Sequence, residues 1–210
     1  MGAGGHAQVI ADALLRTAER DAVIAPVGYL DDDPSLIGQN FLGLPVLGAL
    51  SDVNRIPHDA VIVAIGDNAT RQRIFERLQS QGEHFAVARH PHTVVGAGVS
   101  IGPGSMICAG VVINPGSVIG ANVILNTACT VDHHNRIGDH AHLAPGVHTG
   151  GDVTIGAGTL IGIGATVMPQ RRVGAWCIVG AGSLVHADLP DNVMATGVPA
   201  RVIRTLVKEH

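Results

Sequence analysis

Five histidines stand close together in the second half of this 210-residue chain: His133, His134, His140, His142 and His148. A neutral imidazole titrates near physiological pH, so a histidine beside an amine or a hydroxyl is a natural general base. For any single one of them, a solvated surface position is the simpler explanation. Five histidines within sixteen residues indicate a functional site.

The segment that must position these side chains repeats every six residues between residues 95 and 185. Every sixth residue is aliphatic, and Thr149 alone breaks the series. A helix would need apolar residues three and four apart, and a half-buried strand would alternate with a period of two. One aliphatic residue followed by glycine and a small residue describes instead a short strand and a tight turn. Three such units close a triangular coil, and stacked coils bury their aliphatic residues together, which predicts a parallel β-helix of hexapeptides.

Residues 18 apart should stack on successive coils of such a helix. This arithmetic places His133 over Gly151 and His134 over Asp152, with Thr149 beside them. A local departure from an otherwise strict pattern is expected at a functional site. The histidines near Thr149 are therefore the first candidates for catalysis.

The first part of the chain has the pattern of a small α/β domain. Gly4 and Gly5 precede an amphipathic helix, as in the turn from a first strand into a first helix, where backbone N–H groups and the helix dipole favour a phosphate. No strand pattern stands in front of this turn. Residues 23–30 are predicted to form a second strand that ends at Asp31 and Asp32, where a ribose hydroxyl is usually held.

The later elements of this domain follow the same alternation of strand and helix. Residues 43–47 lead to a short helix from Ser51, and residues 59–65 form an apolar run typical of a buried parallel strand. Gly66 and Asn68 follow this strand, and Asn68 is a candidate cap for a helix over 69–79. Residues 85–88 give one more strand. The prediction is a Rossmann-like domain over residues 1–88 with its site at the carboxyl ends of the strands, and a β-helix domain over 89–210.

Composition narrows the possible functions. The net charge of −4 and the pI near 6.3 give no basic patch, which argues against nucleic acid as a partner. No long apolar run and no signal-peptide pattern are present, so we expect no membrane span and a cytoplasmic protein. Cys108, Cys129 and Cys177 lie far apart, and we interpret them as small buried residues rather than reactive thiols.

Three motifs carry a resemblance to a known family. They are GAGGHA at residues 2–7, NTACTVDHHNRIGDHAHLAPG at 126–146 and GVPAR at 197–201. Together they resemble the sialic-acid O-acetyltransferase family, and within it the bacterial enzymes that N-acetylate nucleotide-linked 4-amino sugars. The resemblance covers almost the whole chain and implies a left-handed β-helix that assembles as a homotrimer, with acetyl-CoA as the co-substrate and no metal.

The resemblance also implies roles for individual residues. His133 would be the general base, and His142 would lie near the thioester. The coenzyme groove between two subunits would be lined by His142, Gly151, Ile163, Gly180 and Ala181. The nucleotide-linked sugar would contact Gly4, Gly5, His6, Asp31, Asp32, Gly66 and Asn68. The reaction would be a direct transfer, with backbone N–H groups stabilising the oxyanion.

One position departs from the pattern of these relatives. They commonly have a carboxylate directly after the base, which orients its ring, whereas this chain has His134. Asp132 or Asp139 could supply the negative charge, but neighbours on a strand point to opposite faces, so Asp132 would need a corner geometry. The partner of the base is left open by the sequence.

Other functions fit parts of the sequence. Trimeric zinc carbonic anhydrases share the hexapeptide helix and use histidine ligands from adjacent subunits, and bound zinc would favour that class. A non-catalytic scaffold or sugar-nucleotide sensor would be unaffected by His133→Ala. Within acetyl transfer, a UDP-linked 4-amino-4,6-dideoxy sugar is the first choice of acceptor. A GDP-linked sugar such as GDP-perosamine, a dTDP-linked sugar and the hydroxyl of a sialic acid are the alternatives.

Overall fold

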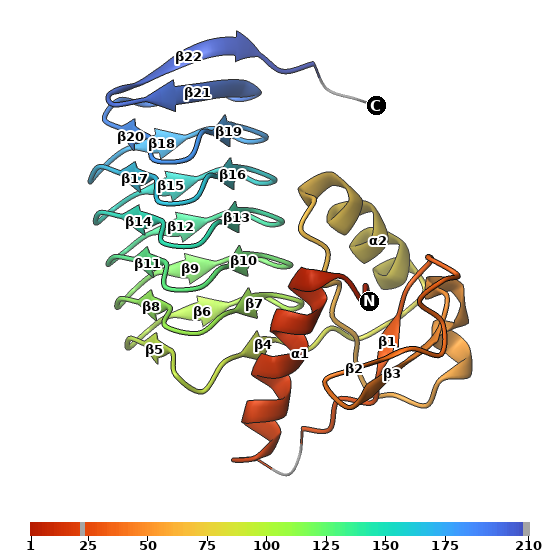
Figure 1. The fold of residues 1–210 in the computed structure, drawn as a ribbon. Helices are drawn as coiled ribbons and strands as arrows, with labels where there is room; N and C mark the ends of the chain where they lie inside the picture. The colour runs from red at the N-terminus through yellow and green to blue at the C-terminus, as the bar shows by residue number, and fades with distance from the viewer. Residues whose placement is uncertain (22–23, 208–210) are drawn as a thin grey trace.

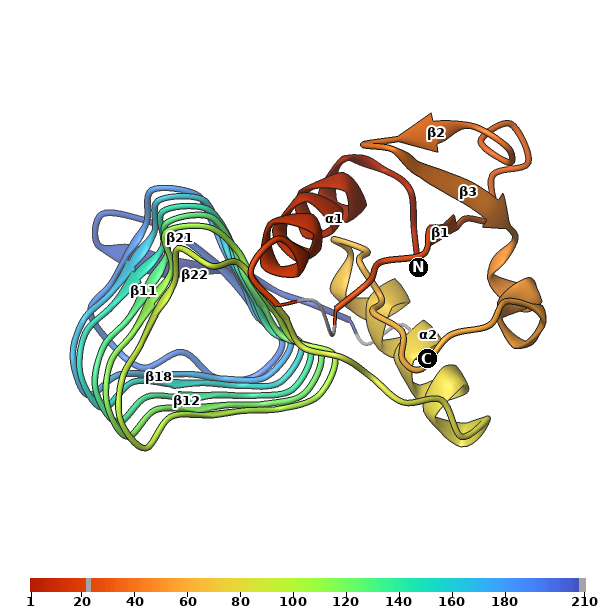
Figure 2. The same ribbon diagram turned by 90° about the horizontal axis from the view of Figure 1, so that it is seen from below.

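The hexapeptide repeats wind into a left-handed parallel β-helix, which Figure 1 shows as a stack of coils and Figure 2 shows end-on as a triangle. The computed structural model describes residues 1–21 and 24–207. Each repeat contributes a two-residue strand, and strands 18 residues apart pair in parallel, as between Ile124 and His142. The predicted fold class and stacking arithmetic are thereby confirmed.

The three sides of the triangle are three sheets, which we name by their contacts. The docking sheet faces the N-terminal domain and contains β4 (Ala88–Arg89), β7 (Met106–Ile107), β10 (Ile124–Leu125), β13 (His142–Leu143), β16 (Leu160–Ile161), β19 (Ile178–Val179), β21 (Val193–Gly197) and β22 (Ala200–Thr205). The second sheet contains β5 (Val94–Val95), β8 (Val112–Ile113), β11 (Thr130–Val131), β14 (His148–Thr149), β17 (Thr166–Val167) and β20 (Leu184–Val185). The third sheet contains β6 (Ser100–Ile101), β9 (Val118–Ile119), β12 (Arg136–Ile137), β15 (Thr154–Ile155) and β18 (Arg172–Val173).

The second residue of most of these strands is the aliphatic residue of the repeat, and it points into the coil. Ile107, Leu125, Leu143 and Ile161 stack in this way on the docking sheet and are fully buried. No single coil could bury such residues alone, so the stack of coils is the unit that stabilises the domain.

The N-terminal domain contains two helices and a small sheet. Its elements are α1 (Gly5–Ala18), β1 (Tyr29–Leu30), β2 (Asn40–Phe41), β3 (Leu44–Gly48), the 3₁₀ helix η1 (Leu50–Arg55) and α2 (Asn68–Ser80). β1 pairs in parallel with β3, and β2 pairs with β3 in the antiparallel sense. The predicted strand over 23–30 is therefore shorter, and residues 22 and 23 lie outside the described part of the chain.

Residues at the very start of the chain take the central position that the sequence left without a strand. The Met1 amine donates to the carbonyl of Ile62, and the N–H of Ala64 donates to the carbonyl of Met1, at 2.8 and 2.9 Å. On the other side, the N–H of Gly2 donates to the carbonyl of Leu30. Met1 and Gly2 thus bridge β1 and the extended segment 61–64, and burial lowers the pKa of the Met1 amine to about 6.

The two domains share a packed interface. Ala7, Ile10 and Ala11 of α1 belong to the same buried cluster as Met106 and Ile124 of the docking sheet. Figure 2 shows α1 and α2 lying beside this one side of the triangle. The N-terminal domain is therefore seated on one face of the β-helix, and the other two sheets face away from it.

Candidate functional site

A cavity of about 510 Å³ opens at the carboxyl ends of the strands of the N-terminal domain. Six residues that the sequence predicted to contact a nucleotide-linked sugar line it: Gly4, Gly5, His6, Asp31, Asp32 and Gly66. A side chain added at Gly4, Gly5 or Gly66 would meet no atom within 4 Å, so these backbones face open space. The size and position are those of a ligand site in an open α/β sheet.

Backbone hydrogen bonds fix the two carboxylates of this cavity. The N–H of Ala3 donates to Asp31 Oδ2 at 2.7 Å, and the N–H of Leu50 donates to Asp32 Oδ1 at 2.9 Å. Each carboxylate keeps further lone pairs with which to accept hydroxyl groups. The rigid placement of both acids suits the recognition of a ribose.

Two arginines on α2 complete the cavity, and the sequence analysis missed them. Arg73 and Arg77 both line it, together with Thr70. Their spacing of four residues puts them on the same face of the helix. Exposed arginines on a helix are common, so only their position after the Gly66–Asn68 turn could have drawn attention to them. They give the cavity a cationic wall that would attract phosphate groups.

Asn68 has a different environment from the one expected. The side chain that caps α2 is Asp67, which accepts the N–H of Thr70 at 2.8 Å, so the prediction that Asn68 is the cap was wrong. Because Asp67 already accepts the N–H at the start of α2, the side chain of Asn68 can point toward the β-helix. Its Nδ2 donates to the carbonyl of Gly158, and its Oδ1 accepts from Arg71. Asn68 is buried between the domains and does not line the cavity described above.

Arg71 is fully buried beside Asn68 and connects the two domains. Its guanidinium donates to the carbonyls of Asn122 and His140, at 3.1 and 2.6 Å, and to those of Ile65 and Gly66. Burial lowers its pKa to about 10, and the charge of Asp67 opposes that shift. We call the residues of the β-helix that receive this side of α2, Asn122, His140 and Gly158, the docking corner.

His6 and His142 face each other across the domain interface, with ring centroids 6.2 Å apart. Burial, with the charge of Arg71 as a second cause, lowers the pKa of each to about 4, so both rings are neutral at pH 7. In the described part of the chain, Nε2 of His6 has no hydrogen-bond partner. His142 Nε2 lies 3.2 Å from the amide nitrogen of Asn126. A neutral His6 at the edge of the cavity has a ring nitrogen available for a ligand.

His133 and His134 lie between β11 and β12, at the corner where the second and third sheets meet. We call residues 132–135 the histidine corner. The ring of His133 lies directly over the backbone of Gly151, and any side chain at that position would collide with it. Gly151 was expected in the coenzyme groove; its contact here is with the ring of His133. Both histidines are exposed, and their Nδ1 atoms are 3.0 Å apart.

Asp132 holds the main chain of this corner rather than the ring of the base. Its Oδ1 accepts the N–H of His133 at 2.8 Å and the amide of Asn114 at 2.7 Å. The hydrogen bond from Asn114, followed by that from His133, lowers the pKa of the Asp132 carboxyl. Asp132 therefore stays ionised and fixes the backbone from which His133 projects.

The hydrogen bonds of Thr149 explain why this position is not aliphatic. It is buried inside the coil, and its hydroxyl accepts a hydrogen bond from the amide of Asn135 at 2.7 Å and donates to the carbonyl of Thr130 at 3.3 Å. Asn135 is itself fully buried, and Ser117 accepts its N–H at 3.1 Å. A polar group inside the coil thus anchors the chain on both sides of the two histidines.

The other histidines of the sequence cluster lie elsewhere. His140 is buried at the docking corner, where its Nδ1 lies 2.9 Å from the amide of Asn122, and burial lowers its pKa. His148 lies on the second sheet with Nδ1 2.8 Å from the hydroxyl of Thr130. One of the five histidines faces the N-terminal domain with His6, one supports the docking corner, and two form the histidine corner.

Three further predicted coenzyme residues share the third corner of the triangle, between the docking and second sheets. Ile163 and Ala181 are 18 residues apart on successive coils, and Gly180 precedes Ala181. Ile163 is 61% exposed, which is unusual for its type. A column of glycines runs beside it, at Gly146, Gly164 and Gly182, and a side chain on any of them would meet no atom within 4 Å. This open strip of backbone suits a long ligand that needs close approach to peptide groups.

The predicted residues are therefore brought together in three separate groups within one chain. The nucleotide-sized cavity lies on the docking-sheet side, whereas the histidine corner lies between β11 and β12, across the triangle from the N-terminal domain in Figure 2. Within one chain, His133 and the cavity therefore lie on different sides of the β-helix. A second copy has to supply one half of any site that uses both.

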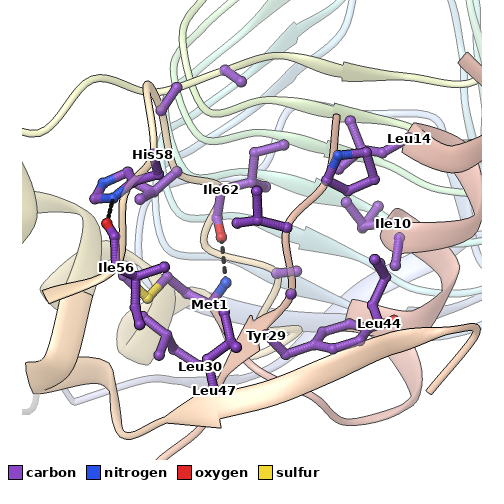
Figure 3. A pocket seen from close by; sticks show the side chains of 18 of the residues that line it. Met1, Ile10, Leu14, Tyr29, Leu30, Leu44, Leu47, Ile56, His58 and Ile62 are labelled. Atoms are coloured by element: carbon purple, nitrogen blue, oxygen red, sulfur yellow. Dashed lines mark hydrogen bonds between the residues drawn. The ribbon is translucent and has the colours of Figure 1, made fainter. Parts of the chain in front are cut away.

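A second cavity, of about 550 Å³, lies at the other end of the same sheet. Figure 3 shows its mainly apolar walls and the hydrogen bond from the amine of Met1 to the carbonyl of Ile62. Residues on both flanks of Met1, 25–28 and 59–61, line it. It lies at the amino ends of the strands and lacks the arginines of the first cavity, so it is the weaker candidate for an anionic ligand.

Few of the described residues are arranged for metal or thiol chemistry. His133, His134 and Asp152 form the one group whose potential ligand atoms all lie within 4.8 Å of one another, and all three are exposed. The cysteines Cys108, Cys129 and Cys177 are buried and unpaired as disulfides, and burial raises the pKa of each thiol. None of the described helices is long and apolar enough to cross a membrane.

Two family models match the chain. The PglD N-terminal domain model matches residues 1–78, and the bacterial transferase hexapeptide model (six repeats) matches residues 92–127 and 152–187. Among characterised proteins, the chain is 44% identical over 54 residues to a galactoside O-acetyltransferase from Escherichia coli (strain K12), covering 26% of this chain and 27% of that protein. It is 42% identical over 55 residues to a putative acetyltransferase, YvoF, from Bacillus subtilis (strain 168), covering 26% and 32%. The chain thus spans about a third or less of the length of these curated relatives.

Solved structures match over nearly the whole chain. The acetyltransferase domain of PglB from Neisseria gonorrhoeae FA1090 is 33% identical with a TM-score of 0.89, covering 96% of this chain and 97% of that one. PerB from Caulobacter crescentus, solved in complex with CoA and GDP-perosamine, is 38% identical with a TM-score of 0.88, covering 97% and 95%. The PglB domain has also been solved in complex with acetyl coenzyme A.

The β-helix places the chain among the hexapeptide-repeat transferases. Because the likeness to both solved structures extends through the N-terminal domain as well, the chain belongs to the family of hexapeptide-repeat acetyltransferases with a PglD-type N-terminal domain.

Proposed function

We propose that this protein transfers the acetyl group of acetyl-CoA to the 4-amino group of a nucleotide-linked amino-dideoxy sugar. The observation that carries the proposal is the combination of a cavity walled by two carboxylates and two arginines with an exposed histidine at a corner of the β-helix. The carboxylates and arginines of the cavity suit a nucleoside diphosphate, and the exposed histidine suits deprotonation of an attacking amine. Family membership and the PerB complex with CoA and GDP-perosamine support this assignment.

In the cavity, the ribose and the diphosphate of the nucleotide each have complementary groups. Asp31 and Asp32 accept hydroxyl groups of the ribose, while Arg73 and Arg77 bind the diphosphate. The N–H groups of Gly4 and Gly5 at the start of α1 add partial positive charge at the same place. The neutral ring of His6 donates a hydrogen bond to the diphosphate or the sugar.

We propose a homotrimer as the active form. In one chain the cavity and His133 lie on different sides of the triangular β-helix, so the sugar held by one subunit meets the base of its neighbour. Acetyl-CoA lies along the β-helix between two subunits, where Ile163, Gly180 and Ala181 and the open glycine column receive it. His142, partly buried beside His6, faces the reacting groups from the sugar-bearing subunit.

The reaction is a direct transfer between the two bound substrates. The amine nitrogen attacks the thioester carbonyl, the ring of His133 takes the proton, and the CoA thiolate leaves. Backbone N–H groups near Gly151 stabilise the oxyanion. Holding both substrates in one cleft supplies a large part of the acceleration, since a free amine is already a competent nucleophile. A covalent intermediate is not required, and the three buried thiols are poorly placed to form one.

The nucleotide is the least constrained part of the proposal. A UDP-linked sugar is the first choice from the sequence, and the likeness to PerB with GDP-perosamine adds weight to a GDP-linked acceptor. The groups identified in the cavity bind ribose and diphosphate, which both nucleotides share. We place the enzyme in the cytoplasm, where nucleotide-linked sugars and acetyl-CoA are made.

The test is release of free CoA thiol from acetyl-CoA with UDP-, GDP- and dTDP-linked 4-amino sugars. We expect turnover with one nucleotide series and a fall in kcat of about 10²- to 10⁴-fold in His133→Ala, the range for removal of a general base. His148→Ala, which removes an exposed ring from the second sheet, is the matched control and should keep its activity. No turnover with any amine, but acetylation of a sialic acid hydroxyl, would refute the proposed acceptor.

A further inference from the structure

The histidine corner lacks the carboxylate that the chemistry of a histidine base calls for next to it. A carboxylate beside the ring fixes its tautomer and stabilises the imidazolium that forms during the reaction. Asp132 Oδ1 accepts hydrogen bonds from the backbone N–H of His133 and from the side-chain amide of Asn114. Asp139 accepts the N–H of Ala121 at 2.8 Å, at the corner between the third and docking sheets. Neither supplies the ring of His133 with a partner.

The ring that does contact His133 is that of His134. Their Nδ1 atoms are 3.0 Å apart, and the rings meet edge to face with centroids 5.2 Å apart. For two neutral rings this distance requires that one Nδ1 carries a proton and the other accepts it. When His133 is the donor, its Nε2 lone pair is free to take a proton from a substrate amine.

Asp152 is the carboxylate that faces this pair. It lies one coil above His134, 18 residues later, and its N–H donates to the carbonyl of His133 at 3.0 Å. One of its carboxylate oxygens and one ring nitrogen from each histidine all lie within 4.8 Å of one another. The charge of Asp152 therefore lies close to both rings, although it comes from a different coil.

The backbone holds the three side chains in this arrangement. His134 and Asp152 both have left-handed backbone, with φ of 57° each, so they project from equivalent positions of successive coils. The ring of His134 packs over Gly116, as the ring of His133 packs over Gly151. Glycine at both positions leaves room for the two rings.

We propose that Asp152, acting through His134, is the positioning residue for the His133 base, and that this three-residue relay replaces the adjacent carboxylate. The inference rests on the function proposed above. As the amine nitrogen bonds to the acetyl carbon and the C–S bond breaks, His133 Nε2 takes the amine proton. His133 Nδ1–H remains donated to His134, and Asp152 stabilises the positive charge without accepting the proton. The proton then passes to the CoA thiolate, which leaves as the free thiol.

The test is the rescue of Asp152→Asn by a carboxylate placed directly after the base. Asp152→Asn should lower kcat on the order of 10-fold, less than the 10²–10⁴ of a whole general base, with the KM of both substrates unchanged. His134→Asp should be active, since Asp tolerates left-handed backbone. In the His134→Asp background, Asp152→Asn should change kcat by less than 2-fold, because the relay is bypassed.

Other outcomes would overturn the proposal. Asp152→Asn with the kcat of the wild type, or with the same loss in both backgrounds, would show that Asp152 does not act through His134. Asp139→Asn is the matched control and should keep its kcat. If the purified enzyme contains zinc and loses activity with a chelator, the three residues are metal ligands instead of a relay. An inactive wild type would contradict the proposed function itself, whereas an active wild type with an insensitive Asp152→Asn would contradict the relay alone.

Discussion

The histidine corner and the docking corner occupy adjacent vertices of the same β-helix, and both contain a histidine with left-handed backbone. His134 and His140 have φ of 57° and 60°. His134 is exposed and faces another ring and a carboxylate, whereas His140 is buried against Asn122 and Phe75. The same residue type at the same kind of turn therefore supports domain packing at one vertex and, in the proposed mechanism, chemistry at the other.

What separates the two corners is what covers them. At the docking corner α2 excludes water, and the pKa of His140 is lowered because burial disfavours its charged form. At the histidine corner no part of the described chain covers the rings, so water or another subunit does. The hydrogen bond between Thr149 and Asn135 stabilises the histidine corner from inside the coil. Arg71, which belongs to α2, stabilises the docking corner from outside the coil.

Arg71→Met should break the docking corner with the largest effect on stability. The substitution removes the donor for four backbone carbonyls and the Asn68 amide oxygen. We expect a loss of about 3 to 5 kcal/mol in the free energy of unfolding, measured with urea. Arg77→Met, on the exposed face of the same helix, is the control and should change stability little while raising the KM for the nucleotide sugar. Equal stability of the two variants would contradict the role given to Arg71.

Acidification should weaken the domain interface before it affects the rest of the fold. His6 and His142 have pKa values lowered to about 4, against 6.5 for the unfolded chain. The unfolded state therefore binds more protons between these values, so the stability from each neutral ring is complete above pH 6.5 and declines as the pH falls toward 4. We expect a loss of about 2 kcal/mol per ring at pH 5.

The measurement for this second prediction is the urea midpoint from pH 7.5 to 4.5 for wild type, His6→Gln and His142→Gln. Each variant should show a shallower decline than the wild type below pH 6.5. Parallel curves for all three proteins would mean that these rings are not the groups that titrate.

Thr149→Val should reveal whether the histidine corner depends on the polar group inside the coil. Valine completes the aliphatic series but leaves the amide of Asn135 without its 2.7 Å partner. We expect a net loss of about 1 kcal/mol of stability and a lower kcat with unchanged KM, because the loop that carries His133 loosens. A more stable and fully active variant would show that Thr149 is an ordinary member of the aliphatic series.

The β-helix could be predicted from sequence because its repeat and its geometry have the same period. One aliphatic residue in six and stacking at 18 placed His133 over Gly151 correctly. The same period also explains why the five histidines were wrongly expected to form one site. Sixteen residues cover almost a full turn of the triangle, so neighbours in the histidine cluster project from different sides.

The N-terminal domain was less predictable in its details. Its strands are short, and β1 contains only Tyr29 and Leu30, so their pattern carries little periodic signal. Six of the seven expected sugar-contact residues line one cavity because strand ends meet at one edge of a sheet. Arg73 and Arg77 were not predicted because exposed charges on a helix carry no signal by themselves. Asn68 was predicted in the wrong place, because Asp67 is the cap and Asn68 bonds between the domains.

The buried contacts of Arg71 with Asn122 and His140 also fix the height at which the N-terminal domain is attached along the β-helix axis. Successive coils lie about 4.8 Å apart. In the proposed enzyme, attachment one coil higher or lower would move the whole sugar past the base of the neighbouring subunit. For the proposed reaction, the coil on which the domain sits would therefore have to match the coil that carries His133, whatever residues touch the sugar.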